Sequence, residues 1–319
     1  MTIIVLAAAM LLAAPVPSGV ERDTVEPIPF TQSATTVDAL MALGRPVVLA
    51  HTGGEDEFPG STMYAFRRSM DAGVDVLDLN VVLTADGVLA VQHDLDVDRQ
   101  TDGTGLVSEM TFADLHELDN AFWFTAECGP CHDRSGDAYV FRGVRTGVVP
   151  PPAGFSADDF AVPRLEELLD AFPDIPLGIE IKADGEVGAA TADALVAVLT
   201  DFDRLDAVVV SSFSDDVIAH VQNIAPDIDV SPGAGALTEF LAHGTPLPAG
   251  QRVVQPPPLP ADKVAALHDA GYVVWVWPND RQLEHVDAYV TLLADGYDGL
   301  NVNFPADGIR AVEAFVNGS

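Results

Sequence analysis

Residues 74–94 read VDVLDLNVVLTADGVLAVQHD and contain two β-branched runs joined by a tight turn. The run at 81–84 is separated from the run at 88–92 by only three residues. A parallel crossover needs a dozen or more residues, so this connection predicts an antiparallel hairpin. The hairpin extends the strand that precedes it and returns His93 and Asp94 to the carboxyl end of that strand.

Around this hairpin, short β-branched runs alternate with helical stretches from residue 45 onward. Strand and helix in alternation predict parallel βαβ units, and eight such strands fit an α/β fold of the (β/α)8 TIM barrel type better than an open sheet. The predicted barrel domain covers residues 45–317. The expected strands are 46–50, 74–80, 176–182, 207–212, 228–231, 252–255, 272–277 and 299–303. The expected helices are 62–72, 187–199, 214–225, 261–270 and 281–293.

Residues 120–162 interrupt this alternation, because they are rich in glycine, proline and aromatic residues and have no helical period. Loops of this length in a domain are usually functional lids or insertions. We therefore expect a lid or insertion between the second and third barrel strands that covers the barrel mouth. A helix then restarts at 162–168.

Polar residues stand where the first three barrel strands and the hairpin end, and barrel enzymes place their active residues at these ends. They are His51, Asp78, Asn80, His93, Glu180 and Lys182. Oxygen ligands suit Mg²⁺ or Ca²⁺, and paired histidines suit general acid–base chemistry. Singly, each has a plainer interpretation, such as a loop histidine, turn chemistry or a strand cap. Their convergence at one end of the barrel favours a site.

The chain has 319 residues, with 15 Lys+Arg against 49 Asp+Glu and a net charge of −34. This charge opposes binding to polyanions, so it argues against nucleic acid and against an anionic membrane surface as partners. Only two lysines occur, Lys182 and Lys263. An anionic ligand would need a local cationic centre.

The amino terminus carries an apolar run at 3–14, which is too short to span a bilayer. The run predicts a secretory signal peptide over residues 1–20 and an extracytoplasmic location, secreted or in the cell envelope. The basic residue that usually precedes such a run is missing, and a helix at the amino terminus is the alternative.

Cys128 and Cys131 form a CGPC motif in the insertion. The motif can indicate a redox site, but acidic neighbours such as Glu127 and Asp133 oppose the lowered thiol pKa that redox chemistry needs. A small structural disulfide in an exported loop is the favoured interpretation. Two cysteines alone do not make a zinc site.

The chain resembles the glycerophosphodiester phosphodiesterase family over residues 46–316. The resemblance rests on several motifs in the family's order. These are HTG at 51–53, PGST at 59–62, DLN at 78–80, TADG at 84–87, HD at 93–94, RQT at 99–101, EIK at 180–182, SF at 212–213, WPN at 277–279 and DGL at 298–300.

The resemblance implies a metal-dependent hydrolysis of glycerophosphodiesters to glycerol 3-phosphate and an alcohol. It implies His51 and His93 as the general acid and base. The implied ligands of a divalent metal, Mg²⁺ or Ca²⁺, are Asp78, Asn80 and Glu180. It further implies that Lys182 and Trp277 bind the small-molecule substrate.

Several positions depart from the family's motifs, namely Thr52 for an arginine, Gly60 and Ser61 for Glu-Asn, and Asn80 for an acid. We therefore expect weaker metal binding. An acid at 55–57 is one candidate to compensate for the lost carboxylates, and Arg142 or Arg145 is a candidate to replace the missing arginine.

Two alternatives remain for the function. One is a barrel with a weakened metal site that binds a phosphodiester without catalysis. The other is a phospholipase-type phosphodiesterase of similar fold. An exposed apolar rim would favour the phospholipase, with Phe122, Trp123 and Phe124 as the candidates for it.

Overall fold

The computed structural model of this protein describes residues 34–318. The predicted signal peptide at 1–20 lies outside the described residues. Over the described range, no helix is both long enough and apolar enough to cross a membrane.

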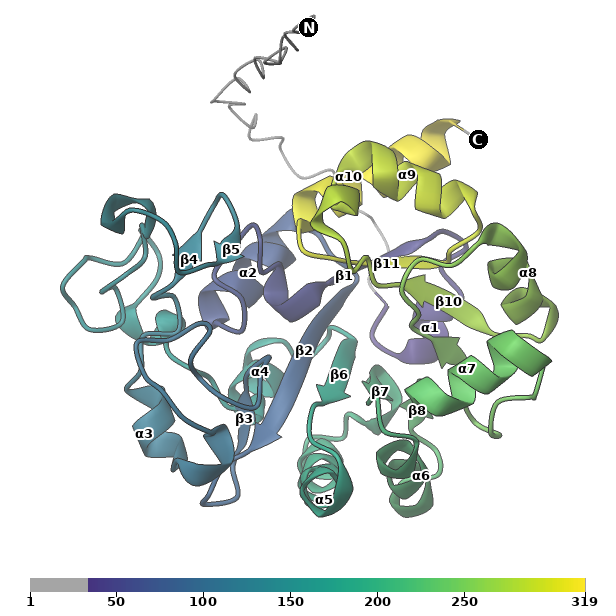
Figure 1. Cartoon of the computed structure of the whole chain (residues 1–319), viewed down its shortest axis with the longest axis horizontal. Coiled ribbons are helices and arrows are strands. Elements are labelled where there is room, and N and C mark those ends of the chain that lie inside the picture. Colours follow the sequence, from purple (N-terminus) through teal and green to yellow (C-terminus); the bar gives the residue numbers. More distant parts are fainter. Residues whose placement is uncertain (1–33, 319) are drawn as a thin grey trace, which may run out of the picture.

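Eight parallel strands form a nearly closed barrel with helices around it (Figure 1), which confirms the predicted (β/α)8 fold. The strands follow the order β8-β7-β6-β2-β1-β11-β10-β9 around the barrel, and the two end strands of this order, β8 and β9, are not paired with each other in the described chain. Their bounds are β1 Val47–Ala50, β2 Val76–Leu83, β6 Leu177–Ile181, β7 Val208–Ser211, β8 Asp229–Val230, β9 Val253–Val254, β10 Val273–Val276 and β11 Gly299–Val302.

The predicted hairpin is present. Strand β3, Leu89–Val91, pairs antiparallel with the distal half of β2, with Val81 opposite Val91 and Leu83 opposite Leu89. Because β2 runs without interruption from the barrel wall into the hairpin, the turn carries the chain back toward the barrel mouth.

Four of the expected helices are found within two residues of their expected ends. They are α2 Met63–Ala72, α5 Gly185–Asp201, α6 Asp215–Ile224 and α8 Ala261–Asp269. The helix expected at 281–293 is divided into a 3-10 turn, η6 Arg281–Leu283, and α9 Val286–Ala294. The division arises because the His285 ring accepts a hydrogen bond from the Ala288 amide and caps a new helix.

The remaining elements were not among the expected ones or begin later than expected. The helices are α1 Val37–Met41, α3 Phe112–His116, α4 Leu165–Ala171, α7 Ala234–His243 and α10 Pro305–Gly318. The 3-10 turns are η1 His51–Gly53, η2 Val107–Glu109 and η5 Leu205–Ala207. Glycines in the first turns of α7 and α10 weaken the helical signal of these two segments.

The barrel interior changes from apolar to polar along the strands. Leu49 and Trp275, together with the strand residues Val76 and Val209, form an apolar cluster into which Leu40 of α1 packs. Helix α1 precedes β1 and therefore covers the amino-terminal ends of the strands. The apolar layer fills the lower barrel and leaves the polar residues of the same strands at the carboxyl ends.

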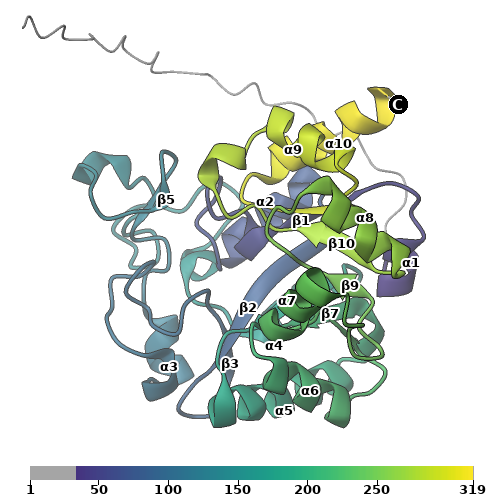
Figure 2. The same cartoon turned by 45° about the vertical axis from the view of Figure 1, so that its right-hand side comes forward.

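The insertion has little regular structure: β4 Phe124–Thr125, β5 Gly129–Pro130, η3 Gly136–Ala138 and η4 Ala157–Phe160. It lies beside the barrel in both views (Figures 1 and 2). Tyr64 of α2 contacts the rings of Phe141, Phe155 and Phe160, so an aromatic cluster attaches the insertion to α2.

We predict that Leu40→Ala lowers the free energy of unfolding by about 2–5 kcal/mol, because it leaves a cavity where α1 closes the barrel. Leu40 is 2% exposed, and the 45% exposed Leu95 offers a matched control whose alanine variant costs under about 0.5 kcal/mol. Denaturant unfolding measures both. Equal losses for the two variants would contradict the role given to α1.

Candidate active site

A cavity of about 480 Å³ opens at the carboxyl ends of the strands. Most of the site residues expected from the sequence line it: His51, Asp78, His93, Glu180, Lys182 and Trp277. Asn80 is buried next to this set, where its side chain contacts Glu180. The prediction that the insertion covers the mouth is wrong, since no residue of 120–162 is among the described lining residues, and the insertion flanks the cavity.

The two histidines face each other. His51 begins the turn η1 directly after β1, and His93 follows β3 by two residues. Their ring centroids are 5.5 Å apart, with the planes nearly perpendicular. The Trp277 ring lies 6.1 Å from the His51 ring. The hairpin thus brings together two rings that are 42 residues apart in the sequence.

The side-chain amide of Asn303 determines which nitrogen of the neutral His51 ring carries the proton. His51 Nδ1 lies 2.8 Å from Asn303 Oδ1, and Asn303 Nδ2 donates to Asp56 Oδ2 at 3.0 Å. Because the amide nitrogen of Asn303 is used by Asp56, its oxygen accepts from His51, and Nδ1 of His51 carries the proton. The neutral His51 ring therefore has Nε2 as its basic atom.

His93 has a charged partner instead. His93 Nδ1 lies 2.7 Å from Asp94 Oδ1, and Arg99 Nε donates to Asp94 Oδ2 at 2.5 Å. Burial raises the pKa of Asp94, but the hydrogen bonds and charges of His93 and Arg99 outweigh it and hold this pKa well below its usual range. Burial lowers the pKa of His93, and the Asp94 hydrogen bond offsets this only in part.

Glu55 lies between the two histidine environments. Its Oε2 accepts from both terminal nitrogens of Arg99 at 3.2 Å, and its Oε1 is 3.8 Å from His51 Nδ1. Burial raises the pKa of Glu55, but the positive charge of Arg99 and the histidines outweighs it, and the net pKa is lowered. Glu55 is thus held as a carboxylate, and Glu55, Arg99 and Asp94 form an ionic chain from one histidine to the other.

The position of Glu55 explains Gly60, one of the departures from the family motifs. A Cβ at Gly60 would lie 2.7 Å from Glu55 Cβ and 2.7 Å from Thr52 Oγ1. Because residue 60 has no side chain, Glu55 and Thr52 can occupy the space that a Cβ there would fill. The other two acids of this loop bind elsewhere, since Asp56 pairs with Arg281 and Glu57 accepts from the Ala306 amide.

Asp78, Asn80 and Glu180 lie together on the inner wall formed by β2 and β6. The parallel register sets Asn80 opposite Glu180 and Asp78 opposite Gly178. Asn80 Nδ2 donates to Glu180 Oε2 at 2.8 Å, and Lys182 Nζ donates to the same oxygen at 2.9 Å. The absence of a side chain at Gly178 makes room for Asp78, because a Cβ there would lie 2.6 Å from Asp78 Oδ1.

Oxygen atoms without partners favour a cation at this wall. Asn80 Oδ1 and Glu180 Oε1 are buried and have no hydrogen-bond partner among residues 34–318, and the same holds for Asn301 Oδ1 of β11. Burial raises the pKa of Asp78 to about 7, although a hydrogen bond from Asn301 opposes the rise. Unpaired oxygens beside a desolvated carboxyl group fit a hard divalent cation.

Arg142 and Arg145 of the insertion do not line the cavity. Arg142 is enclosed by aromatic rings, 3.9 Å from the Tyr139 centroid and 4.1 Å from that of Phe122, and its Nε donates to the Phe122 carbonyl. Arg145 donates to the His116 carbonyl and pairs with Asp158. The suggestion that either arginine replaces the one missing at Thr52 is wrong, and Arg99 instead contacts Asp94 and Glu55 beside the two histidines.

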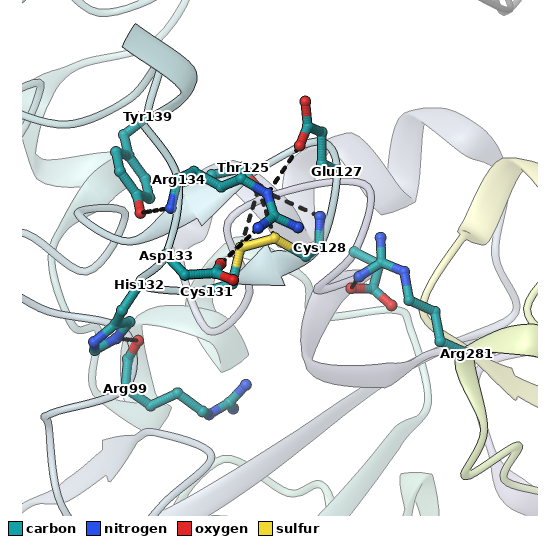
Figure 3. Close-up of a disulfide and its surroundings, with 11 residues drawn as sticks. Arg99, Thr125, Glu127, Cys128, Cys131, His132, Asp133, Arg134, Tyr139 and Arg281 are labelled. Atoms are coloured by element: carbon teal, nitrogen blue, oxygen red, sulfur yellow. Dashed lines mark hydrogen bonds and ion pairs between the residues drawn. A yellow bond between two sulfur atoms is a disulfide. The ribbon is translucent and has the colours of Figure 1, made fainter. Parts of the chain in front are cut away.

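Cys128 and Cys131 form a disulfide in the insertion (Figure 3). Asp133 lies near both sulfur atoms, but sulfurs bonded to each other are not thiolate ligands for a metal. The turn between the cysteines abuts the site loop, since a Cβ at Gly129 would lie 2.5 Å from Asp56 Oδ1. His132 contacts the Arg99 carbonyl at 3.0 Å, so the insertion supports the site from outside.

The sequence interpretation did not assign site roles to Asn303, Asn301, Arg99 or Asp94. Asn301 and Asn303 occupy alternate positions of the expected strand 299–303, and the rule that selected Asp78 and Asn80 would have selected them too. No pattern in the sequence predicts that Arg99 contacts Glu55 and Asp94, because these contacts depend on the path of the loop after β3.

Comparisons with known proteins show what the chain is similar to. The model of the glycerophosphoryl diester phosphodiesterase family matches residues 51–307. The chain is 27% identical over 191 residues to a glycerophosphodiester phosphodiesterase of Caldanaerobacter subterraneus, which covers 58% of this chain and 65% of that relative, just under two thirds of its length. It is 25% identical to a glycerophosphodiester phosphodiesterase of Bacillus altitudinis, over 83% of this chain and 98% of the relative.

Solved structures support the fold. An Oleispira antarctica phosphodiesterase in complex with the product sn-glycerol-3-phosphate superimposes with a TM-score of 0.65 at 22% identity. The superposition covers 86% of this chain and 99% of that one.

We predict that Gly60→Ala destabilises the protein by about 1–3 kcal/mol, because the added methyl group overlaps Glu55 and Thr52. Gly136→Ala is the matched control, since a Cβ at Gly136 meets nothing within 4 Å. Denaturant unfolding compares the two variants. A Gly60→Ala protein as stable as its control would show that Glu55 is not packed against residue 60.

Proposed function

Because the chain belongs to the glycerophosphoryl diester phosphodiesterase family, we propose that it hydrolyses glycerophosphodiesters to glycerol 3-phosphate and an alcohol. The observation that carries this proposal is the pair of facing histidines with different Nδ1 partners, an amide for His51 and a carboxylate for His93. The product named for the Oleispira antarctica relative agrees with it.

The hydrogen-bond partners of the two Nδ1 atoms support different roles for the two rings. His51 is the general base, since its Nε2 is free to take the proton of the substrate's own 2-hydroxyl as that oxygen attacks phosphorus. His93 is the general acid, because Asp94 stabilises its protonated ring, and its Nε2 proton passes to the oxygen of the leaving alcohol. A water molecule then opens the cyclic phosphate, with the two roles reversed.

Lys182 binds the phosphate group next to the inner wall formed by β2 and β6. Lys182 offers a cation beside Glu180, the local positive charge that an anionic substrate needs in a protein of net charge −34. Asp78, Asn80 and Glu180 would hold a divalent metal, Mg²⁺ or Ca²⁺. Such an ion supplies Lewis-acid stabilisation of charge on the phosphoryl oxygens.

A binding protein without catalysis is the second candidate, and one contact favours it. Asn80 Nδ2 and Lys182 Nζ both donate to Glu180, so this carboxylate has partners even without a metal.

We further propose that the protein is exported, which the apolar run at 3–14 and the disulfide support. Mass spectrometry of the protein recovered outside the cytoplasm tests this proposal, since removal of the predicted signal peptide over residues 1–20 should lower the mass of the chain.

The function is tested by the hydrolysis of glycerophosphoglycerol by the purified protein, treated with a chelator and then supplied with Ca²⁺ or Mg²⁺. We expect metal-stimulated release of glycerol 3-phosphate. His51→Ala should lower kcat/KM by about 10²–10⁴-fold, the usual contribution of a general base. If the native protein does not exceed this variant but still binds the diester by calorimetry, the binding protein is the correct alternative.

The pH dependence tests the role of His93. A general acid must be protonated, so activity should fall as pH rises through the pKa of His93, which burial lowers. In Asp94→Asn the carboxylate that raises this pKa is gone, and the basic limb of the kcat/KM profile should move to lower pH. Asp98→Asn, at an exposed position of the same loop, should leave the profile in place. An unmoved limb in Asp94→Asn would rule out His93 as the acid.

A further inference from the structure

The charged residues that line the cavity are confined to one side. Asp78, Glu180 and Lys182 come from β2 and from the end of β6, next to the two histidines. The opposite side, lined by residues that follow β8, β9 and β10, contains no charged residue within the described chain. This division is notable in a protein with 49 acidic residues.

The uncharged side contains an apolar wall, next to the neutral polar residues Ser231, Thr238, Gln255 and Asn279. We use this name for Leu237 and Leu241 of α7, Pro257 and Leu259 after β9, and Phe213 after β7, all of which line the cavity. The three leucines are partly buried and pack with one face against the core, which fixes the wall. Phe213 at the rim is 65% exposed, a high value for a phenylalanine.

The wall coincides with the gap in the barrel. Strands β8 and β9 are the two unpaired ends of the strand order, and the segments that follow them supply most of the wall. Helix α7 lies over this part of the barrel (Figure 2). The cavity therefore extends from the histidines, past Asp78 and Glu180, to the apolar wall on the other side.

We propose that this site prefers glycerophosphodiesters that carry an alkyl or acyl chain over those with a small charged headgroup. The inference rests on the proposed function, because Lys182 then holds the phosphate and the substituent extends toward the apolar wall. A charged headgroup finds no ion pair on that side, whereas a chain buries apolar area against the leucines. The size of the cavity is that of a site for a ligand larger than the phosphate group alone.

The chain can be attached at either end of the diester, and two substrate series separate these cases. One series is glycerophospho-n-alkanols from methanol to octanol, with the chain on the alcohol. The other is 1-O-alkyl-glycerophosphoglycerols of the same lengths, with the chain on the glycerol. We expect kcat/KM to rise up to about fourfold per methylene in one series, since a buried CH₂ contributes about 0.8 kcal/mol. Glycerophosphocholine should be a poorer substrate than the butanol diester.

Leu237→Asn tests the wall itself and should lower the ratio of kcat/KM for the octyl over the methyl substrate by at least tenfold. Glu239→Gln, on the same helix at an exposed position outside the cavity, should leave this ratio unchanged. Thermal unfolding of both variants shows whether each is folded at the assay temperature. Should Leu237→Asn be unfolded, Leu259→Asn at the other side of the wall takes its place.

Binding of methyl, butyl and octyl phosphate to the native protein, measured by calorimetry, separates failure of this inference from failure of the proposed function. If no diester is hydrolysed but the dissociation constant falls with chain length, the proposed function is wrong and the apolar wall is still correct. If short diesters are hydrolysed and neither kcat/KM nor affinity depends on chain length, the function holds and the inference is overturned. A higher kcat/KM for glycerophosphocholine than for the octyl member of either series would also overturn it.

Discussion

The parallel register between β2 and β6 is the constraint on which the site depends. It sets Asn80 beside Glu180 and Asp78 beside Gly178, on the inner face of the barrel. Below these residues the interior is filled by Leu49, Trp275 and their apolar neighbours. A shift of one residue in this pairing would turn the polar side chains into the apolar layer around the barrel, at a large cost in desolvation. The apolar filling and the polar site therefore fix the same register.

The sequence was informative where a local rule acts. The β-branched runs predicted all eight barrel strands, and the three-residue turn predicted the hairpin that delivers His93. The positions of the strand ends predicted that Asp78, Asn80 and Glu180 converge at one end of the barrel. The sequence was less informative about side chains whose positions depend on packing between distant segments of the chain. Arg142 looked like a free cation of the insertion, but the rings of Phe122, Trp123 and Tyr139 enclose it. The position of Glu55 likewise depends on the space left by Gly60, which no pattern along the chain reveals.

The two lysines of the chain illustrate how the negative charge is accommodated. Lys182 pairs with Glu180 inside the cavity, and Lys263 donates to the Leu241 carbonyl on α7. Other charges of the site are neutralised in place, as with Arg99 between Glu55 and Asp94 and Arg281 beside Asp56. Lys182 and these arginines thus offset the acidic side chains near the phosphate position, which allows a strongly acidic protein to hold an anionic ligand there.

The contact between the disulfide turn and the site loop has a consequence for protein engineering. Gly129 lies against Asp56, and His132 holds the Arg99 carbonyl, so the insertion is an outer brace for residues that orient both histidines. It is not a detachable module. A chimera can replace the insertion with that of a relative only if the contacts to Asp56 and Arg99 are transferred with it. Otherwise the surface of the site loop that the insertion covered has to be redesigned.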